Sequence, residues 1–138
     1  MPFSTNITVR FGDCDPAGIV YYPVFFHYYH IALEEFFAVR CGITYHDLRE
    51  CERLGFPTVK SEAEFFAPLT DGDRVTVEMN VSRVGNSSVM FVYRLMRDGQ
   101  LCAQTTNVNV CMDMEAMRSV AIPEKYRCVF IELAGKGD

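Results

Sequence analysis

The sequence predicts an α+β fold in which one long helix packs against one antiparallel sheet. An apolar stretch with helix-like ends lies in the first third of the chain, and segments with a two-residue apolar period fill most of the remainder. Short turns join those segments, as in antiparallel sheets. The length of 138 residues is typical of one domain, so we expect a single domain over residues 1–138.

The N-terminal third is predicted to hold a short strand at Asn6–Phe11 and a helix at Pro23–Cys41. Pro23 suits a first helical turn, and Gly42 suits the position just past a helix end. Apolar residues occur on nearly every face of this helix: Val24, Phe25, Phe26, Tyr28, Tyr29, Ile31, Ala32, Leu33, Phe36, Phe37, Ala38 and Val39. A helix of this kind is normally buried on most sides, so we expect other parts of the fold to surround it.

The rest of the chain alternates between apolar and polar residues. After a short helical or irregular piece at 45–54, strands are predicted at 59–65, 75–82, 89–95 and 100–112. Turns are expected at Pro68–Asp73, Gly85-Asn86 and Asp98-Gly99, and the Asp-Gly pair is a strong hairpin signal. A short helix at Pro123–Leu133 completes the prediction.

Composition excludes several classes of function. The chain is 49% hydrophobic with a net charge of −5, its mean hydropathy is +0.04, and its basic residues are scattered, which argues against nucleic-acid binding. The N-terminus lacks a secretory signal and no stretch is long and apolar enough for a membrane span, so we expect a cytoplasmic location and no membrane partner. Its six cysteines form no CxxC pair and are expected to be free thiols.

The segment FGDCDPAGIVYYP, Phe11–Pro23, places Asp13 and Asp15 in a Pro-Gly turn directly before the helix. Turn chemistry accounts for one of these carboxylates but not for both. The segment closely resembles the signature of the 4-hydroxybenzoyl-CoA thioesterase family, in the hotdog-fold superfamily of acyl-CoA thioesterases. The order of later features is similar as well: Phe66-Ala67-Pro68 ends a strand, and Gly72-Asp73 precedes three more.

This resemblance implies a hotdog fold, in which the sheet wraps around the long helix. It also implies an acyl-CoA substrate that is hydrolysed to free acid and CoA. Family members join two sheets edge to edge, so we expect a homodimer or homotetramer with active sites at the subunit interface. Neither a cofactor nor a metal is expected.

By analogy with the family, Asp15 is the catalytic carboxylate, acting either as a nucleophile on the thioester carbonyl or as a general base for water. The backbone N–H of Tyr22, at the positive end of the helix, is expected to polarise that carbonyl. Gly18, Ile19, Val20 and Tyr21 are expected to line the approach, and Gly18 permits a sharp bend. Asp13 is expected to fasten the loop by accepting backbone N–H bonds.

Other residues also have types and spacings that suit chemical roles. His27, His30 and Glu34 have a spacing that suits metal ligands on one helix face, but hydrogen bonding inside the fold is the better interpretation. Other hotdog thioesterases carry an acid on the long helix, which keeps Glu34 and Glu35 open; an ion pair or a solvent-facing position is favoured for both. Cys14 is interpreted as a spacer.

The substrate is less sharply predicted. The turn at Gly85-Asn86 lacks the basic cluster that holds the CoA phosphates in the 4-hydroxybenzoyl-CoA enzyme, and the remaining candidates are each interpreted as solvated surface residues: Arg83, Arg94, Arg97 and Lys125. The aromatic rings of Tyr21, Tyr22, Phe25 and Phe26 are expected to be mostly core, with one or two lining an acyl pocket. Aromatic crowding favours a small, aromatic or short acyl group over a fatty one. The alternative is a catalytically silent hotdog module that binds an acyl group or supports oligomerisation.

Overall fold

The computed structural model describes residues 2–135. Its helices are α1 (Tyr22–Arg40), α2 (Tyr45–Glu50) and α3 (Glu124–Leu133), preceded by a short 3-10 turn at Phe11–Asp13. The main sheet contains β1 (Phe3–Thr8), β3 (Thr58–Phe65), β4 (Arg74–Val84), β5 (Ser88–Arg97) and β6 (Gln100–Val110). A small second sheet contains β2 (Leu54–Gly55), β7 (Met112–Asp113) and β8 (Arg118–Ser119).

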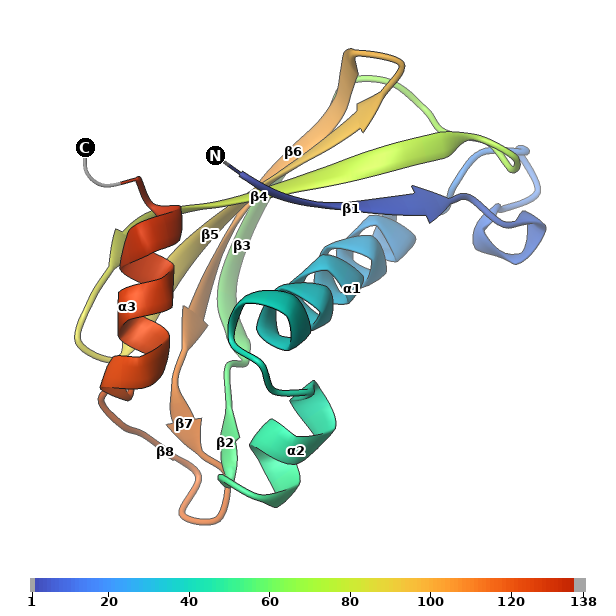
Figure 1. The fold of residues 1–138 in the computed structure, drawn as a ribbon. Coiled ribbons are helices and arrows are strands. Elements are labelled where there is room, and N and C mark those ends of the chain that lie inside the picture. The colour runs from blue at the N-terminus through green and yellow to red at the C-terminus, as the bar shows by residue number, and fades with distance from the viewer. Residues whose placement is uncertain (1, 136–138) are drawn as a thin grey trace.

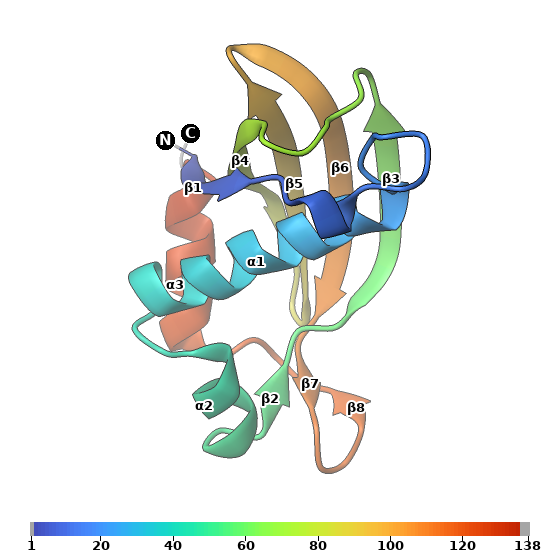
Figure 2. The same cartoon turned by 90° about the vertical axis from the view of Figure 1, so that its right-hand side faces the viewer.

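The main sheet is antiparallel, with the strand order β1-β4-β5-β6-β3. Figure 1 shows it curving over α1, and Figure 2 shows α1 running across its strands with α3 beside it. Asp98 and Gly99 form the two-residue loop between β5 and β6, with φ of 51° and 78°, as expected for the predicted hairpin. This architecture confirms the predicted α+β hotdog fold.

The core lies between α1 and the concave face of the sheet. The α1 residues that are buried there are Phe25, Tyr28, Tyr29, Ala32, Leu33, Phe36 and Phe37. From α3, Phe130 stacks on Phe36 with ring centroids 6.0 Å apart. The opposite face of α1 remains open, and Val39 is 63% exposed. The expectation that the helix is surrounded on most sides is therefore wrong for a single chain, because the sheet covers one face only.

Every predicted strand differs from its counterpart in the structure by at least one residue, and two of these differences have a clear cause. The first strand is β1 at Phe3–Thr8 rather than Asn6–Phe11, because its pairing ends where Thr8 meets Arg74, the first residue of β4. The strand predicted at 100–112 stops at Val110, which pairs with Ser88 at the start of β5. Beyond Val110 no described strand of the main sheet is available for pairing. The chain continues as β7, which pairs with β2. Among the described residues, no helix is long and apolar enough to cross a membrane.

Candidate active site

The loop before α1 closes on itself through backbone hydrogen bonds. The Asp15 N–H donates to the Ile19 carbonyl at 2.9 Å, and the Gly18 N–H donates to the Asp15 carbonyl at 2.9 Å. Cys14 and Val20 face each other as an isolated antiparallel bridge. Gly18 has a φ of 83°, a conformation that residues with a Cβ rarely adopt, which is the physical reason for glycine at this position.

Asp13 fastens this loop to the helix. Its Oδ2 accepts the Arg10 N–H at 3.0 Å and the Tyr28 hydroxyl at 2.7 Å, while its carbonyl accepts the Tyr21 N–H at 3.0 Å. Burial, together with the Asp13 hydrogen bond, raises the pKa of Tyr28 well above its usual value, so the phenol stays protonated and donates. These contacts match the fastening role predicted for Asp13.

Asp15 has a different environment. Its Oδ1 accepts the Ala17 N–H at 2.9 Å, whereas Oδ2 makes no hydrogen bond with any described residue. The half-buried carboxylate lines a hollow of about 310 Å³, together with Gly12, Asp13, Cys14, Pro16, Tyr21 and Val24. One carboxylate oxygen is thus fixed while the other is available to react.

The N-terminus of α1 follows immediately and leaves one backbone donor uncommitted. The Tyr21 N–H is taken by Asp13, Pro23 has no N–H, and the Val24 N–H donates to the Tyr21 carbonyl at 2.8 Å. Within residues 2–135, the Tyr22 N–H makes no hydrogen bond. It lies at the positive end of a 19-residue helix, where developing negative charge is stabilised.

The residues expected to line the approach occupy different environments. Tyr21 lines the Asp15 hollow and is 52% exposed. Ile19, two positions earlier in the chain, is 40% exposed. The side chain of Val20 is only 5% exposed, so Val20 faces the core rather than the approach. Gly18, Ile19 and Val20 do not line this hollow, although their backbone shapes the turn that carries Asp15.

The aromatic residues at the start of α1 divide into two groups. Tyr22 is 61% exposed and meets Phe65 of β3 edge to face at 6.5 Å, and Phe25 meets the same ring at 5.0 Å. Tyr28 and Tyr29 are 2% and 1% exposed. Of the four rings expected to be mostly core, Phe25 is buried, whereas Tyr21 and Tyr22 are exposed; Tyr28 and Tyr29 pack the core and line no approach.

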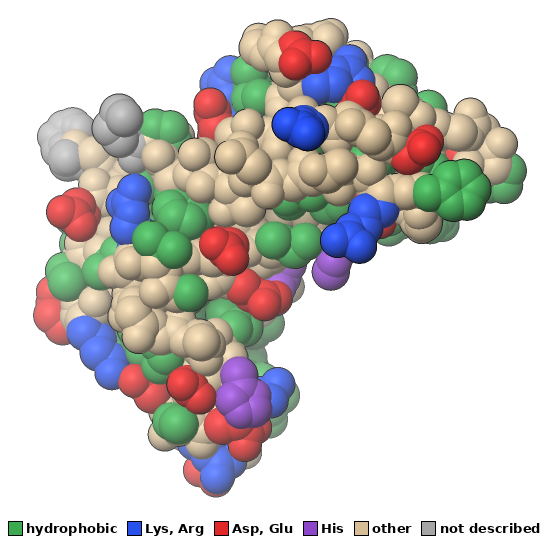
Figure 3. Space-filling model, turned by 45° about the vertical axis from the view of Figure 1, so that its right-hand side comes forward, with side chains coloured by type: hydrophobic (Ala, Val, Ile, Leu, Met, Phe, Trp, Pro, Cys, Tyr) green, Lys and Arg blue, Asp and Glu red, His purple; other side chains and the backbone are tan. Residues whose placement is uncertain are grey.

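A larger cavity lies on another flank of α1. It has a volume of about 520 Å³ and is lined by His30, Glu34, Tyr45, His46, Arg49, Leu54, Gly55, Phe56, Pro57, Thr58 and Met114. A neighbouring hollow of about 220 Å³ shares His30 and Thr58 with it, and adds Phe26, Leu33, Ser61, Tyr93 and Asn107. Figure 3 shows the surface hollowed between two arms of the molecule, with histidine side chains along the hollow. We call these two hollows together the His30 cavity.

Polar groups in the His30 cavity are paired with one another. His30 Nδ1 lies 2.7 Å from Glu34 Oε2, and the ring of Tyr45 meets that of His30 edge to face at 5.3 Å. Burial raises the pKa of Tyr45 to about 12, so its hydroxyl stays protonated. His30 and Glu34 form a hydrogen-bonded pair as predicted, but on a half-exposed surface rather than inside the fold, and His27 is exposed and makes no hydrogen bond with any described residue. Among residues 2–135, no cluster of three or more His, Cys, Asp or Glu side chains suits a metal ion.

Sequence reasoning missed the cavity because its walls come from distant segments. His30 belongs to α1, His46 and Arg49 to α2, and Met114 follows β7. The prediction for Arg97 is also wrong. Its guanidinium lies 3.0 Å from the Asp73 carboxylate, and both side chains are mostly buried. Arg97 is therefore not a solvated surface residue. Lys125 is 61% exposed and pairs with Glu52 at 2.6 Å.

Comparisons with known proteins identify the class of protein to which this fold and the Asp15 loop belong. The model of the thioesterase-like superfamily matches residues 9–130, so the chain belongs to this superfamily. The acyl-CoA thioesterase YbgC of Haemophilus influenzae is 28% identical over 131 residues, which cover 95% of this chain and 96% of that protein.

Two further relatives are named for aromatic substrates. The 4-hydroxybenzoyl-CoA thioesterase of Pseudomonas sp. strain CBS-3 is 28% identical, over 86% of this chain and 89% of that protein. The structure of the BH1999 gentisyl-coenzyme A thioesterase superimposes with a TM-score of 0.83 at 26% identity, over 90% of this chain and 98% of that one. The chain is accordingly a thioester hydrolase.

Proposed function

We propose that this protein hydrolyses acyl-CoA thioesters to free acid and CoA, with Asp15 as its catalytic carboxylate. The observation that carries the proposal is the half-buried Asp15 with one unpartnered oxygen, in the loop that leads into the free Tyr22 N–H of α1. A thioester oxygen near that N–H gains stabilisation as it becomes negative in the transition state. The names of the relatives support CoA as the thiol.

Two routes are open to the Asp15 carboxylate. As a nucleophile, it attacks the thioester carbonyl, expels the CoA thiolate and forms a mixed anhydride, which water then hydrolyses. As a general base, it takes a proton from the water that attacks the same carbonyl. Hydrolysis in H₂¹⁸O under single-turnover conditions identifies the anhydride route if ¹⁸O enters Asp15, because water that attacks the Asp15 carbonyl of the anhydride leaves its oxygen there, whereas the base route never labels Asp15.

For the acyl group, we propose a compact aromatic or short chain. The exposed rings of Tyr22, at the start of α1, and Phe65, at the end of β3, offer edge and face contacts to a benzoyl-type group, worth roughly 0.5–1.5 kcal/mol. Relatives named for 4-hydroxybenzoyl and gentisyl esters support this class. The test compares kcat/KM for 4-hydroxybenzoyl-CoA, butyryl-CoA and palmitoyl-CoA, and a palmitoyl value above both others contradicts the proposal.

The second proposal concerns assembly: two copies join their sheets at β3. This strand pairs with β6 on one side and is the terminal strand of the sheet, and nearly all of its residues are exposed. Val59 is 60% exposed and Phe65 is 46% exposed. An edge strand with free backbone groups and apolar side chains is a natural partner for another strand. Light scattering in dilute buffer is expected to give a dimer or tetramer, and an active monomer contradicts the proposal.

Such pairing has a consequence for the active site. Thr58, at one end of β3, lines the His30 cavity, whereas Phe65, at the other end, contacts Tyr22 and Phe25 at the start of α1. In a symmetric antiparallel β3 pair, the Thr58 end of one copy meets the Phe65 end of its partner. The His30 cavity of one copy then lies next to the α1 N-terminus of the other, which makes it the candidate acyl pocket.

A further inference from the structure

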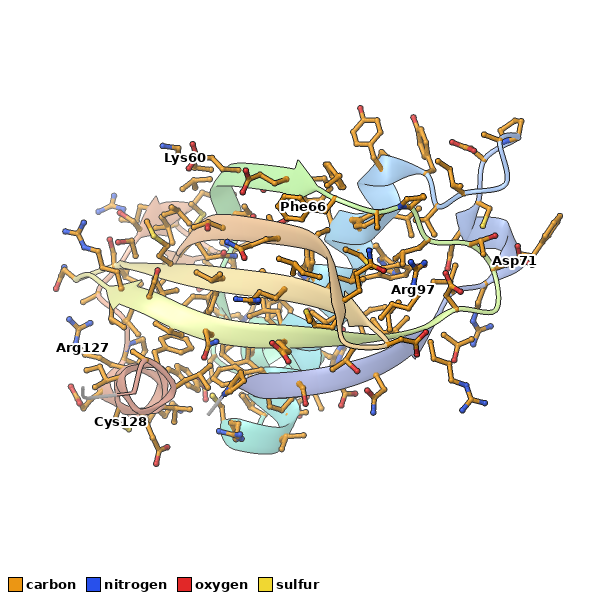
Figure 4. The ribbon with its side chains drawn as sticks, turned by 90° about the horizontal axis from the view of Figure 1, so that it is seen from above. Lys60, Phe66, Asp71, Arg97, Arg127 and Cys128 are labelled. Carbon is orange, nitrogen blue, oxygen red and sulfur yellow. The ribbon has the colours of Figure 1, made fainter. Side chains whose placement is uncertain are left out.

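Arg97 and Asp73 lie outside the Asp15 hollow, yet they connect to it through the loop between β3 and β4. Arg97 is the last residue of β5, and Figure 4 shows it within the curve of the loop that runs from Phe66 to Asp71. Its Nη1 donates to the Pro68 carbonyl at 2.9 Å and to Asp73 Oδ2 at 3.0 Å. One guanidinium thus holds both ends of the 68–73 loop.

The interior of that loop is fixed by the same carboxylate. Asp73 Oδ2 accepts the Thr70 N–H at 2.9 Å, and the Asp73 N–H donates to the Thr70 carbonyl at 3.1 Å. The Thr70 N–H and the Arg97 guanidinium lower the pKa of Asp73, so the carboxylate is charged at neutral pH. Arg97 and Asp73 are only 24% and 22% exposed, so solvent screens this ion pair less than a fully exposed one.

Two hydrogen bonds connect this loop to the turn that carries Asp15. The Thr70 hydroxyl donates to the Gly18 carbonyl at 2.8 Å, a shorter contact than its 3.2 Å approach to Asp71 Oδ1. The Val20 N–H donates to the carbonyl of the buried Leu69 at 2.8 Å. Gly18 and Val20 lie three and five positions after Asp15, within or next to the turn that the Asp15 backbone closes.

We propose that Thr70, Asp73 and Arg97 form a brace that positions the Asp15 carboxylate for the proposed hydrolysis. Arg97 and Asp73 set the shape of the loop, and the Thr70 hydroxyl transmits that shape to the Gly18 carbonyl. None of the three touches the Asp15 hollow, so each is a positioning residue. A displacement of about 1 Å in a catalytic group lowers the rate of chemistry far more than it weakens ground-state binding.

The test uses the matched pair Thr70→Val and Thr70→Ser. Valine is isosteric with threonine but lacks the hydroxyl, whereas serine keeps it, and Thr70 is exposed, so neither change creates a cavity. Thr70→Val is expected to lower kcat about 10-fold with KM changed less than twofold, and Thr70→Ser to retain kcat within about twofold. Arg97→Gln is expected to lower kcat about as much as Thr70→Val does, and Arg97→Lys is expected to restore part of that loss.

Hydrogen–deuterium exchange of the peptide over residues 12–21 provides a readout that does not depend on activity. Exchange is expected to be faster in Thr70→Val than in Thr70→Ser or the unmodified protein. Unchanged exchange and unchanged kcat in Thr70→Val overturn the brace, as do equal losses in the valine and serine variants. If no acyl-CoA ester is turned over by the unmodified protein, the proposed function fails, and the exchange comparison still decides whether the brace exists.

Discussion

The Asp15 loop and the His30 cavity lie on different flanks of the same helix and are built in different ways. Tyr21 and Val24 border the first, and Phe26, His30 and Leu33 border the second; Val24 and Phe26 are roughly 200° apart around the helix. Backbone hydrogen bonds fix the Asp15 loop, whereas residues from six separate segments build the cavity. The loop is suited to chemistry common to all thioesters, and the cavity is suited to selecting among acyl groups.

The largest expected effect is at Asp15. Asp15→Asn should lower kcat by at least ~10²-fold for every ester, because it removes the nucleophile or base with almost no change in size. Glu35→Gln is the matched control, since Glu35 is an exposed acid on α1 and should leave kcat within about twofold. Steady-state thiol release measures both. A large loss in Glu35→Gln with activity retained in Asp15→Asn would transfer the catalytic role to the helix.

A smaller effect is expected where the loop is fastened to the core. Tyr28→Phe removes the hydroxyl that Asp13 accepts at 2.7 Å and should lower the free energy of unfolding by about 1–3 kcal/mol. It should also lower kcat several-fold by a similar factor for all esters, since we propose that the loop carries the catalytic carboxylate. Urea denaturation and kcat for three esters test this. An effect confined to one ester would mean that Tyr28 belongs to the acyl pocket instead.

Changes in the His30 cavity should alter selection rather than chemistry. His30→Leu removes a polar group that lies 2.7 Å from Glu34 on a half-exposed surface, so the fold should be kept. We expect kcat/KM for 4-hydroxybenzoyl-CoA to fall several-fold relative to benzoyl-CoA, because a ring hydroxyl loses a hydrogen-bonding partner. Equal changes in kcat/KM for the two esters would contradict the proposal that the cavity, unlike the loop, selects among acyl groups.

The Asp15 loop and the His30 cavity also differ in how far the sequence predicts them. The hairpin at Asp98-Gly99, the α1 helix and the Asp15 motif depend on neighbouring residues, and local patterns reveal them. Arg97 and Asp73 are 24 residues apart in the chain, and the identity of neither residue predicts that the two form an ion pair. The strand break after Val110 is set by where β5 begins, since the alternation of buried positions itself continues through Asn107 and Asn109 to Cys111. The His30 cavity depends on how six segments pack, which no local pattern encodes.

The smallest expected effect concerns pH and the brace. The folded-state pKa of Asp73 is below its ordinary value of about 3.9, so its contribution to stability is present above that value and is lost as pH falls through the folded pKa. Asp73→Asn should therefore be less stable than the unmodified protein at pH 7, and the gap should narrow below about pH 4. Thermal unfolding from pH 7 to 3 measures the gap, and a constant difference would show that the Asp73 charge is irrelevant.

Subunit mixing tests whether the Asp15 loop of one copy and the His30 cavity of another form one active site, as we propose. Asp15→Asn removes the proposed catalytic carboxylate, and His30→Trp narrows the cavity at a half-exposed position; each variant alone is expected to be much less active than the unmodified protein. In mixed dimers, one site combines an intact loop with an intact cavity, so an equal mixture should recover about a quarter of the unmodified activity. Mixed dimers, isolated with two affinity tags, that are no more active than the parent variants would contradict the claim.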